Sequence, residues 1–318
     1  MSRVTANFLL LVVALIWGSA FVPQIQGMRH VGPMTFTAVR FLIGALVVAP
    51  LMWVEWRSLR GGARPLQRTD GLKIAGLGCL LMLGSAMQQI GLMSTTATNA
   101  GFLTALYVTL VPLFGWLLFR HFPHWSVWLG ALACILGAYL LSGAQINTIG
   151  TGDLWVMVSA IPWALHVLLV GRVAHRMSAP FLVAGGQFAA CGLLALLWTS
   201  AYEPVSWTGL QAAAWPLAYT GIFSVGVAFT VQVVAQRHAH AADAAIVLSS
   251  ETLFAALFGF VLMGDRLDAM GLTGCGLIFA SMIVVQLLPL LSAKAHASAI
   301  GRRRDAALTR VIAAVKES

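Results

Sequence analysis

The chain has 318 residues, of which 59% are hydrophobic and only 9% are charged. A soluble globular protein carries roughly 25% charged residues, so this chain cannot cover a water-facing surface, and we interpret it as an all-α integral membrane protein. The net charge of +9 would also suit a nucleic-acid partner. However, Lys and Arg collect in the cytoplasmic loops of membrane proteins, so we expect no nucleic-acid binding.

Ten apolar stretches are long enough to cross a bilayer, which takes roughly 20 helical residues. The first follows a short basic N-terminus. It lacks a clear cleavage site, so we expect it to stay as a span rather than to be removed as a signal peptide. In chain order the predicted helices cover residues 5–27, 33–53, 71–93, 97–119, 125–142, 152–171, 179–199, 212–236, 242–263 and 268–291.

The charges of the loops predict the orientation of these helices. With the N-terminus in the cytoplasm, nearly all loop and tail Lys and Arg residues lie on the cytoplasmic side, and only Arg29 and Arg266 lie outside. Both termini are then cytoplasmic, and we expect a bacterial inner membrane as the location. The tail over 292–318 carries an apolar face among basic residues, which predicts an amphipathic helix on anionic membrane lipids.

The two halves of the chain resemble each other. At an offset of 144 residues Gln88 falls on Gln232, and near the start of each half Trp17 meets Trp163 with a small gap. Each half holds five predicted spans, an odd number, so the second half must be inverted in the membrane relative to the first.

We therefore predict two inverted five-helix repeats, residues 1–142 and 143–291, followed by the cytoplasmic tail. Inverted repeats are typical of secondary transporters, which bind their solute near the midplane between the halves.

Three segments resemble the EamA-type permeases of the drug/metabolite transporter superfamily. They are "ALIWGSAFVPQIQGMRHVGPMTFTAVRFLIGALVV", "TTATNAGFLTALYVTLVPLFGWLL" and "AADAAIVLSSETLFAALFGFVLMGDRL". In the third segment Thr252 stands where the family pattern commonly has Pro, and Asp265 where it has Glu. The resemblance implies a ten-helix exporter with two EamA repeats around a central cavity. Similar members export amino acids, including aromatic ones, other metabolites or cationic drugs.

Glu251 is the only acid deep inside a predicted span. It lies about 14 Å into its helix at 1.5 Å per residue, close to the midplane, and shares a stripe of mostly small residues that is expected to face the bundle. Three roles remain open. Glu251 could bind the amino or cationic group of a solute, take up a proton that couples to transport, or form a structural or gating ion pair with Arg40, the only cation inside a span.

Other polar and aromatic residues inside the spans are candidates for the cavity wall, although plain packing explains each of them equally well. An apolar or aromatic solute requires aromatic walls with a few polar anchors. Asn99 and Asp243 are instead interpreted as helix N-caps. The candidates are Trp17, Gln88, Tyr107, which falls on Glu251 in the repeat, Trp163, His166 and Gln232.

Several kinds of site are not expected. Pro23, Pro112 and Pro162 could kink helices, but they do not match between the repeats, so no broken-helix binding site is predicted. The cysteines lie in apolar runs without a C-x-x-C motif, which favours packing over a metal site, and no cofactor is expected. The chain lacks H-E-x-x-H and a second deep acid, so we do not expect an enzyme.

The sequence thus predicts a carrier that exports small organic solutes, most readily amino acids or related metabolites, by alternating access. The alternative is a proton-coupled multidrug exporter of lipophilic cations that uses Glu251. The partners expected are a small-molecule solute, membrane lipids and, in the second case, protons. The sequence leaves a monomer and a homodimer equally open.

Overall fold

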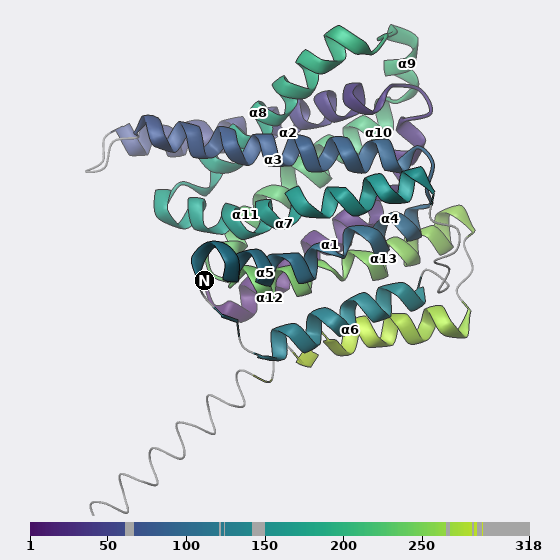
Figure 1. The fold of residues 1–318 in the computed structure, drawn as a ribbon. Helices are drawn as coiled ribbons and strands as arrows, with labels where there is room; N and C mark the ends of the chain where they lie inside the picture. Colours follow the sequence, from purple (N-terminus) through teal and green to yellow (C-terminus); the bar gives the residue numbers. More distant parts are fainter. Residues whose placement is uncertain are drawn as a thin grey trace, which may run out of the picture.

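A computed structural model describes residues 1–60, 67–120, 122–123, 125–141, 150–264, 268–281, 283–284 and 288. Within these ranges the regular structure is entirely helical (Figure 1). The predicted tail at 292–318, Asp265 and Arg266 lie outside the described residues.

Eight helical stretches among the described residues are long and apolar enough to cross a membrane. Two shorter apolar helices, Trp125–Gly137 and Ala269–Ser281, occupy the places of the fifth and tenth predicted spans. The chain is therefore a multi-pass membrane protein. The eight longer stretches are Arg3–Gly27, Pro33–Leu59, Arg68–Leu92, Ala97–Phe119, Thr151–Met177, Pro180–Tyr202, Ala214–Gln236 and Ala241–Met263.

Several stretches consist of more than one helical element. Ala214–Gln236 contains a π-helical segment, η1, and the stretch Ala241–Met263 ends in a second one, η2. The elements are α1 (Arg3–Gly27), α2 (Pro33–Arg60), α3 (Arg68–Leu92), α4 (Ala97–Thr104), α5 (Tyr107–Phe119), α6 (Trp125–Leu141), α7 (Thr151–Met177), α8 (Pro180–Tyr202), α9 (Trp207–Ala212), α10 (Ala214–Tyr219), η1 (Thr220–Phe229), α11 (Thr230–Gln236), α12 (Ala241–Leu248), α13 (Glu251–Phe258) and η2 (Gly259–Met263).

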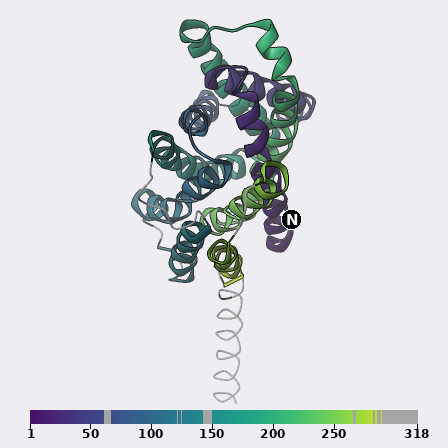
Figure 2. The ribbon, with the colours of Figure 1, turned by 90° about the vertical axis from the view of Figure 1, so that its right-hand side faces the viewer.

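The bundle mixes the two halves of the chain. α2 packs along α8, and α3 packs along α7, so the most extensive helix contacts join one half to the other. α1 contacts α10, η1, α11, α12 and α13, all from the second half. Figure 2, turned by 90° from Figure 1, shows helices of the two halves next to one another in the bundle. A pocket bordered by α1 and these elements therefore lies between the two halves.

Two carboxylates cap the helix pair α2–α8 reciprocally. Glu203, just beyond the end of α8, accepts hydrogen bonds at the start of α2 from Met34 N (2.9 Å), Thr35 N (2.8 Å) and Thr35 Oγ1 (2.7 Å). Near the other end of the pair, Glu55 Oε2 accepts from Leu182 N (2.6 Å) at the start of α8. Free N–H groups at a helix start favour a negative charge. The two caps therefore fasten α2 to α8 at both ends.

Replacing Glu203 with glutamine should weaken this fastening without changing the size of the side chain. Charge-assisted hydrogen bonds contribute about 1.5–3 kcal/mol each, so we expect Glu203→Gln to lower the free energy of unfolding by about 1–3 kcal/mol. Thermal unfolding in detergent measures the effect. Arg29→Gln, at an exposed residue near the start of α2, is the control, and equal stability of the two variants would contradict the role of the cap.

The predicted helices at 97–119 and 242–263 are each interrupted in the middle. α4 ends at Thr104 and α5 begins at Tyr107, while α12 ends at Leu248 and α13 begins at Glu251. These two interruptions are related by the same 144-residue offset that relates the two halves of the chain. The positions of the prolines predicted no broken-helix binding site, and these matching interruptions are a feature that the prolines did not indicate.

Both interruptions arise from a local tightening of the helix. The Leu106 amide bonds to the carbonyl of Leu103 (3.3 Å), three residues earlier instead of four, and the Ser250 amide bonds to Val247 in the same way (3.2 Å). This 3₁₀ pattern inside a longer helix often marks a hinge. Neither interruption contains a proline, so the positions of the prolines carried no information about them.

The predicted N-caps are also wrong. Thr96 caps α4, its hydroxyl accepting a hydrogen bond from Asn99 N (3.1 Å). Asp243 lies inside the first turn of α12 and forms an ion pair with Arg3 at the start of α1.

Candidate functional site

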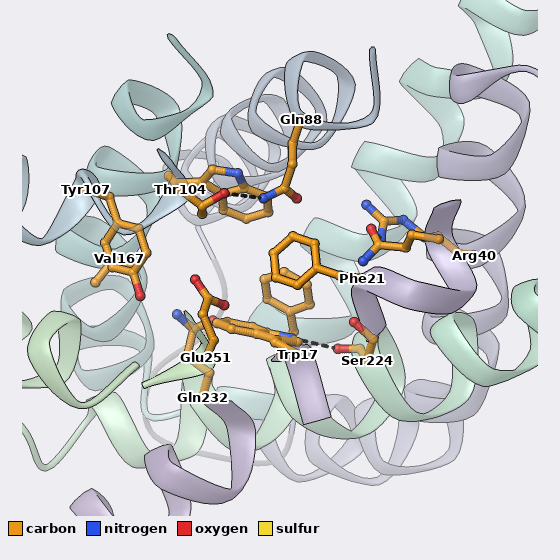
Figure 3. A pocket seen from close by; sticks show the side chains of 13 residues that line it. Trp17, Phe21, Arg40, Gln88, Thr104, Tyr107, Val167, Ser224, Gln232 and Glu251 are labelled. Atoms are coloured by element: carbon orange, nitrogen blue, oxygen red, sulfur yellow. Dashed lines mark hydrogen bonds between the residues drawn. The ribbon is translucent and has the colours of Figure 1, made fainter. Parts of the chain in front are cut away.

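A central pocket lies between the two halves of the chain, and nearly all candidate residues from the sequence line it (Figure 3). Its cavity volume is about 50 Å³, room for a few water molecules but not for a metabolite. Of the predicted residues only His166 is missing from the wall. The lining residues are Trp17, Phe21, Gln24, Arg40, Gln88, Thr104, Tyr107, Trp163, Val167, Ser224, Phe229, Gln232 and Glu251.

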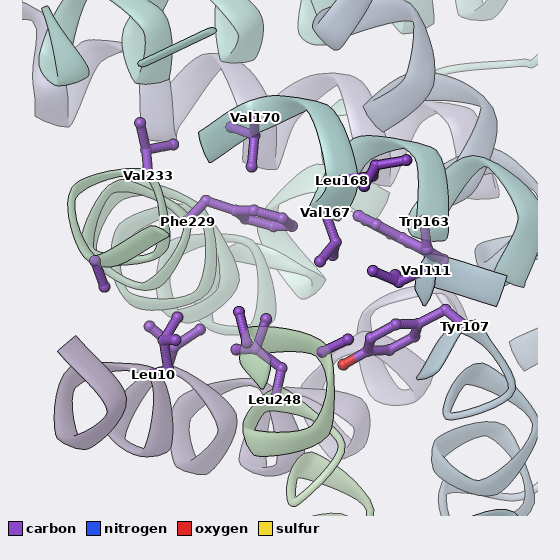
Figure 4. Packing of buried hydrophobic residues seen from close by; sticks show 14 of the residues in the cluster. Leu10, Tyr107, Val111, Trp163, Val167, Leu168, Val170, Phe229, Val233 and Leu248 are labelled. Atoms are coloured by element: carbon purple, nitrogen blue, oxygen red, sulfur yellow. The ribbon is translucent and has the colours of Figure 1, made fainter. Parts of the chain in front are cut away.

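Aromatic rings form one wall of the pocket. Trp163 stacks on Phe229 with ring centroids 5.9 Å apart and an interplanar angle of 17°, and Trp17 contacts the same ring at 4.5 Å. Figure 4 shows Trp163 and Phe229 side by side with Val167. The Trp17 indole donates to the carbonyl of Ser224 in η1 (3.2 Å).

His166 lies behind this wall. Its Nε2 is 2.9 Å from Gln187 Oε1, and its ring packs edge-on against Trp163 and Phe229. The side chain is fully buried, so it supports the aromatic rings from outside the pocket.

Arg40 forms one polar end of the pocket. The side chain is 3% exposed, and its Nη1 donates to Gln24 Oε1 (2.6 Å). Gln89 donates to the same oxygen, and Gln24 Nε2 donates to the carbonyl of Ala20 (3.0 Å). The rings of Phe36 and Phe41 lie 5.8 and 5.1 Å from the guanidinium. The cation is thus held by neutral amides and aromatic rings.

Glu251 forms a second polar end. It is 4% exposed, and among the described residues its carboxylate has neither a hydrogen bond nor an ion pair within 4.0 Å. Figure 3 shows Tyr107 and Gln232 around it. The Tyr107 hydroxyl and both amide atoms of Gln232 are also without a protein partner in the described part of the chain. Buried polar groups are normally hydrogen-bonded, so this end of the pocket offers unused donors and acceptors.

The predicted ion pair between Arg40 and Glu251 is not formed in this structure. Both side chains line the pocket, but the guanidinium turns to Gln24, and in Figure 3 the ring of Phe21 lies between the two groups. The Arg40 guanidinium and the Glu251 carboxyl group therefore line the central pocket from different sides.

The two glutamines that match in the repeat differ in their bonding. Gln88 Nε2 donates to Thr104 Oγ1 (2.9 Å), whereas Gln232 has no partner among the described residues. Matching positions of the two halves therefore line the same pocket. The side chains at these positions differ in chemistry, above all Tyr107 in the first half and Glu251 in the second.

Sequence reasoning missed Phe21, Gln24, Thr104, Val167, Ser224 and Phe229. The polar residue Gln24 could have been found as a further amide inside a span, since such groups are costly in hydrocarbon. Phe229 gave no signal, because an aromatic residue in an apolar helix is ordinary packing until the fold brings Trp17 and Trp163 to it.

Two larger cavities, of about 340 and 380 Å³, lie toward the end of the bundle that carries the N-terminus. Val167 lines both the central pocket and one of these cavities. One of these cavities therefore adjoins the central pocket on its N-terminal side. The two cavities share Arg3, Leu168, Arg172, His240 and Ala241.

The ion pair of Arg3 with Asp243 (2.5 Å) joins α1 to α12 beside these cavities. The Asp243 side chain is 7% exposed, so removing its partner leaves a nearly buried charge unpaired, which is costly. We expect Arg3→Gln to lower the free energy of unfolding by about 1–2 kcal/mol, and Arg3→Gln/Asp243→Asn to cost less than the sum of the single changes. A double-mutant cycle by thermal unfolding in detergent measures this. Simple additivity would contradict the pairing.

Comparison with known proteins shows which family the chain resembles. The model of the EamA-like transporter family matches residues 4–143 and 150–287, which fits an architecture of two repeats. An uncharacterized transporter of Archaeoglobus fulgidus is 31% identical over 289 residues, covering 90% of this chain and 87% of the relative. The uncharacterized transporter YoaV of Bacillus subtilis is 23% identical over 279 residues, covering 84% and 91%.

A solved crystal structure of a protein shares the fold, with a TM-score of 0.72 at 21% sequence identity, and the match covers 90% of this chain and 98% of that one. The family match spans nearly the whole chain, and the relatives are named as transporters. The chain belongs to the EamA-like transporter family.

Proposed function

We propose that this chain is a secondary transporter that exports small organic solutes, most readily amino acids with apolar or aromatic side chains, through the central pocket. The observation that carries the proposal is the pocket wall itself. It combines stacked aromatic rings with buried polar groups that have no protein partner among the described residues, which is the composition of a small-molecule site.

Transport by this pocket requires alternating access. The present cavity of about 50 Å³ must widen to admit an amino acid, and the larger cavities on the N-terminal side mark the side from which it is reached in this conformation. With both termini in the cytoplasm of a bacterial inner membrane, as the loop charges predict, this is the side from which an exporter loads. The repeats 1–142 and 143–291 would then rock against each other.

Counterflow in proteoliposomes tests the proposal. Vesicles containing the purified chain are loaded with an unlabelled amino acid and supplied outside with the labelled form, one amino acid at a time. We expect transient accumulation of at least one apolar or aromatic amino acid, and none in vesicles without protein. Failure to exchange any amino acid would contradict the proposal.

The alternative is a proton-coupled exporter of lipophilic cations. A buried carboxylate without a protein partner beside aromatic rings favours it, since proton and cation could compete for Glu251. Under this alternative, an imposed pH gradient drives uptake of a cationic dye by the wild-type protein. Amino-acid counterflow, in contrast, proceeds without a gradient. The same vesicles therefore separate the two functions.

A further inference from the structure

The two ionisable side chains of the central pocket lack counterions within the described part of the chain. Arg40 is bonded to a neutral amide, and Glu251 has no ion pair among the described residues. Burying an ion without an opposite charge is costly, and the cost is offset when a bound group supplies that charge. A bound solute could therefore supply an anionic group beside Arg40 and a cationic group beside Glu251.

The Arg40 end is prepared for an anion. One N–H direction of its guanidinium is used by Gln24, while Nε has no partner within the described part of the chain. Gln89 and Gln24 fix each other, and the Phe36 and Phe41 rings flank the guanidinium. A guanidinium held in this way presents a rigid fork that matches a carboxylate.

The Glu251 end is prepared for a cation with hydrogen atoms to donate. Its carboxylate accepts, and the free Gln232 carbonyl oxygen and the Tyr107 hydroxyl oxygen add two further acceptors on the same side of the pocket. An ammonium group donates three hydrogen bonds, so this set of oxygens suits a primary amine. Glu251 also opens α13 directly after the tightened turn, so its position is tied to the hinge.

We propose that the pocket, once widened and with the Phe21 ring moved from between its two ends, selects zwitterions, binding the carboxylate of an amino acid at Arg40 and its ammonium group at Glu251, with the apolar side chain against Trp17, Trp163 and Phe229. This inference rests on the proposed transport of amino acids and adds the orientation of the solute. A solute with only one charge leaves the other end of the pocket buried and unpaired. Such mismatches are rejected by large factors.

Three related solutes test the orientation. Phenylalanine carries both charges, phenethylamine lacks the carboxylate, and 3-phenylpropanoate lacks the amine. Exchange of labelled phenylalanine is measured in proteoliposomes with each unlabelled compound as the competitor. If leucine is the better solute, then leucine, 3-methylbutylamine and 4-methylpentanoate form the matching set. For the wild-type chain we expect competition by the amino acid and at least tenfold weaker competition by the other two.

Variants at the two ends should shift this selectivity in opposite directions. Glu251→Gln should raise competition by 3-phenylpropanoate relative to phenylalanine at least tenfold, and Arg40→Gln should do the same for phenethylamine. Each result is a ratio within one variant, so it does not depend on how much protein folds. If a variant does not exchange, the stabilisation of its thermal unfolding by each compound gives the same ratio. Arg29→Gln, outside the pocket, should keep the wild-type ratios.

The outcomes separate this inference from the function on which it rests. A wild-type chain that exchanges no amino acid overturns the proposed function and this inference with it. A wild-type chain that exchanges phenylalanine and phenethylamine equally well overturns only the orientation. The orientation alone is also overturned if Glu251→Gln and Arg40→Gln both favour the same one of the two singly charged compounds.

Discussion

Gly18→Val should abolish transport and destabilise the fold more than any other single change considered. A Cβ atom at this position would lie 2.4 Å from Phe254 Cβ, 2.6 Å from the Glu251 carbonyl oxygen and 2.8 Å from Ala255 N. Two of these atoms belong to the backbone, so α1 would have to move away from α13. Small residues permit such close helix approach in membranes. Overpacking costs about 1–3 kcal/mol where side chains can adjust, and more is expected here.

The matched control is Gly76→Val. Gly76 lies in the helix α3, but a Cβ atom there would meet nothing within 4 Å. Both variants add the same isopropyl group to a transmembrane helix, so the cost of β-branching cancels. Counterflow and thermal unfolding in detergent of the two proteins are compared. Equal behaviour of Gly18→Val and Gly76→Val would show that the α1–α13 contact is not tight.

Phe229→Ala should cause the second-largest loss. Phe229 contacts Trp17, Trp163, His166, Phe41 and Phe188. Removing the ring opens a cavity among side chains that belong to four other helices, α1, α2, α7 and α8. Truncation of a buried Phe costs about 3–5 kcal/mol in soluble proteins. We expect about 3 kcal/mol here, because lipid is as apolar as the protein interior and the loss comes from packing.

Phe223→Ala in the same π-helical segment is the control for this loss. Phe223 is 46% exposed, so its ring faces outward and its removal leaves no enclosed cavity. Thermal unfolding should separate the two variants by several degrees, and exchange of amino acids should fall only for Phe229→Ala. If the two variants unfold alike, the aromatic wall is not the packing centre that its contacts indicate.

The general architecture could be predicted because the bilayer restricts what a chain can do. A spanning segment must satisfy its backbone internally, so apolar stretches of sufficient length become helices. The helix start at Pro33 was predicted, and the start at Pro180 was predicted to within one residue, since proline suits the first turn of a helix. Candidates for the pocket could be found for a related reason. A polar residue such as Glu251 inside hydrocarbon needs a partner or a cavity.

The interruptions before Tyr107 and Glu251 could not be predicted. Residues 105–106 are Ala-Leu and residues 249–250 are Ser-Ser, and neither pair contains the Gly or Pro that usually marks a helix break. The Ser249 and Ser250 hydroxyls do donate to carbonyls three residues earlier (2.7 and 2.6 Å), but the Ala-Leu pair has no such side chains. These two residue pairs therefore give no local signal that both interruptions share.

The missing ion pair has a similar explanation. The predicted depth of each residue in the membrane suggested that Arg40 and Glu251 lie near each other, and both line the central pocket. Depth does not determine the direction in which a side chain points. The guanidinium is turned by Gln24, a residue from α1 that only the folded bundle brings to α2. Pairing of two charges across a bundle depends on such third residues.

The central claim is that the pocket between the repeats is the solute site, and protection of a single cysteine tests it most directly. Thr104→Cys is introduced into a chain in which Cys79, Cys134, Cys191 and Cys275 are replaced by alanine. The rate of its reaction with a membrane-impermeant thiol reagent is measured in proteoliposomes, with Thr69→Cys, outside the pocket, as the control. We expect the transported amino acid to slow the reaction at Thr104→Cys in a concentration-dependent way and to leave Thr69→Cys unaffected. An unchanged rate at Thr104→Cys under saturating amino acid would contradict the claim.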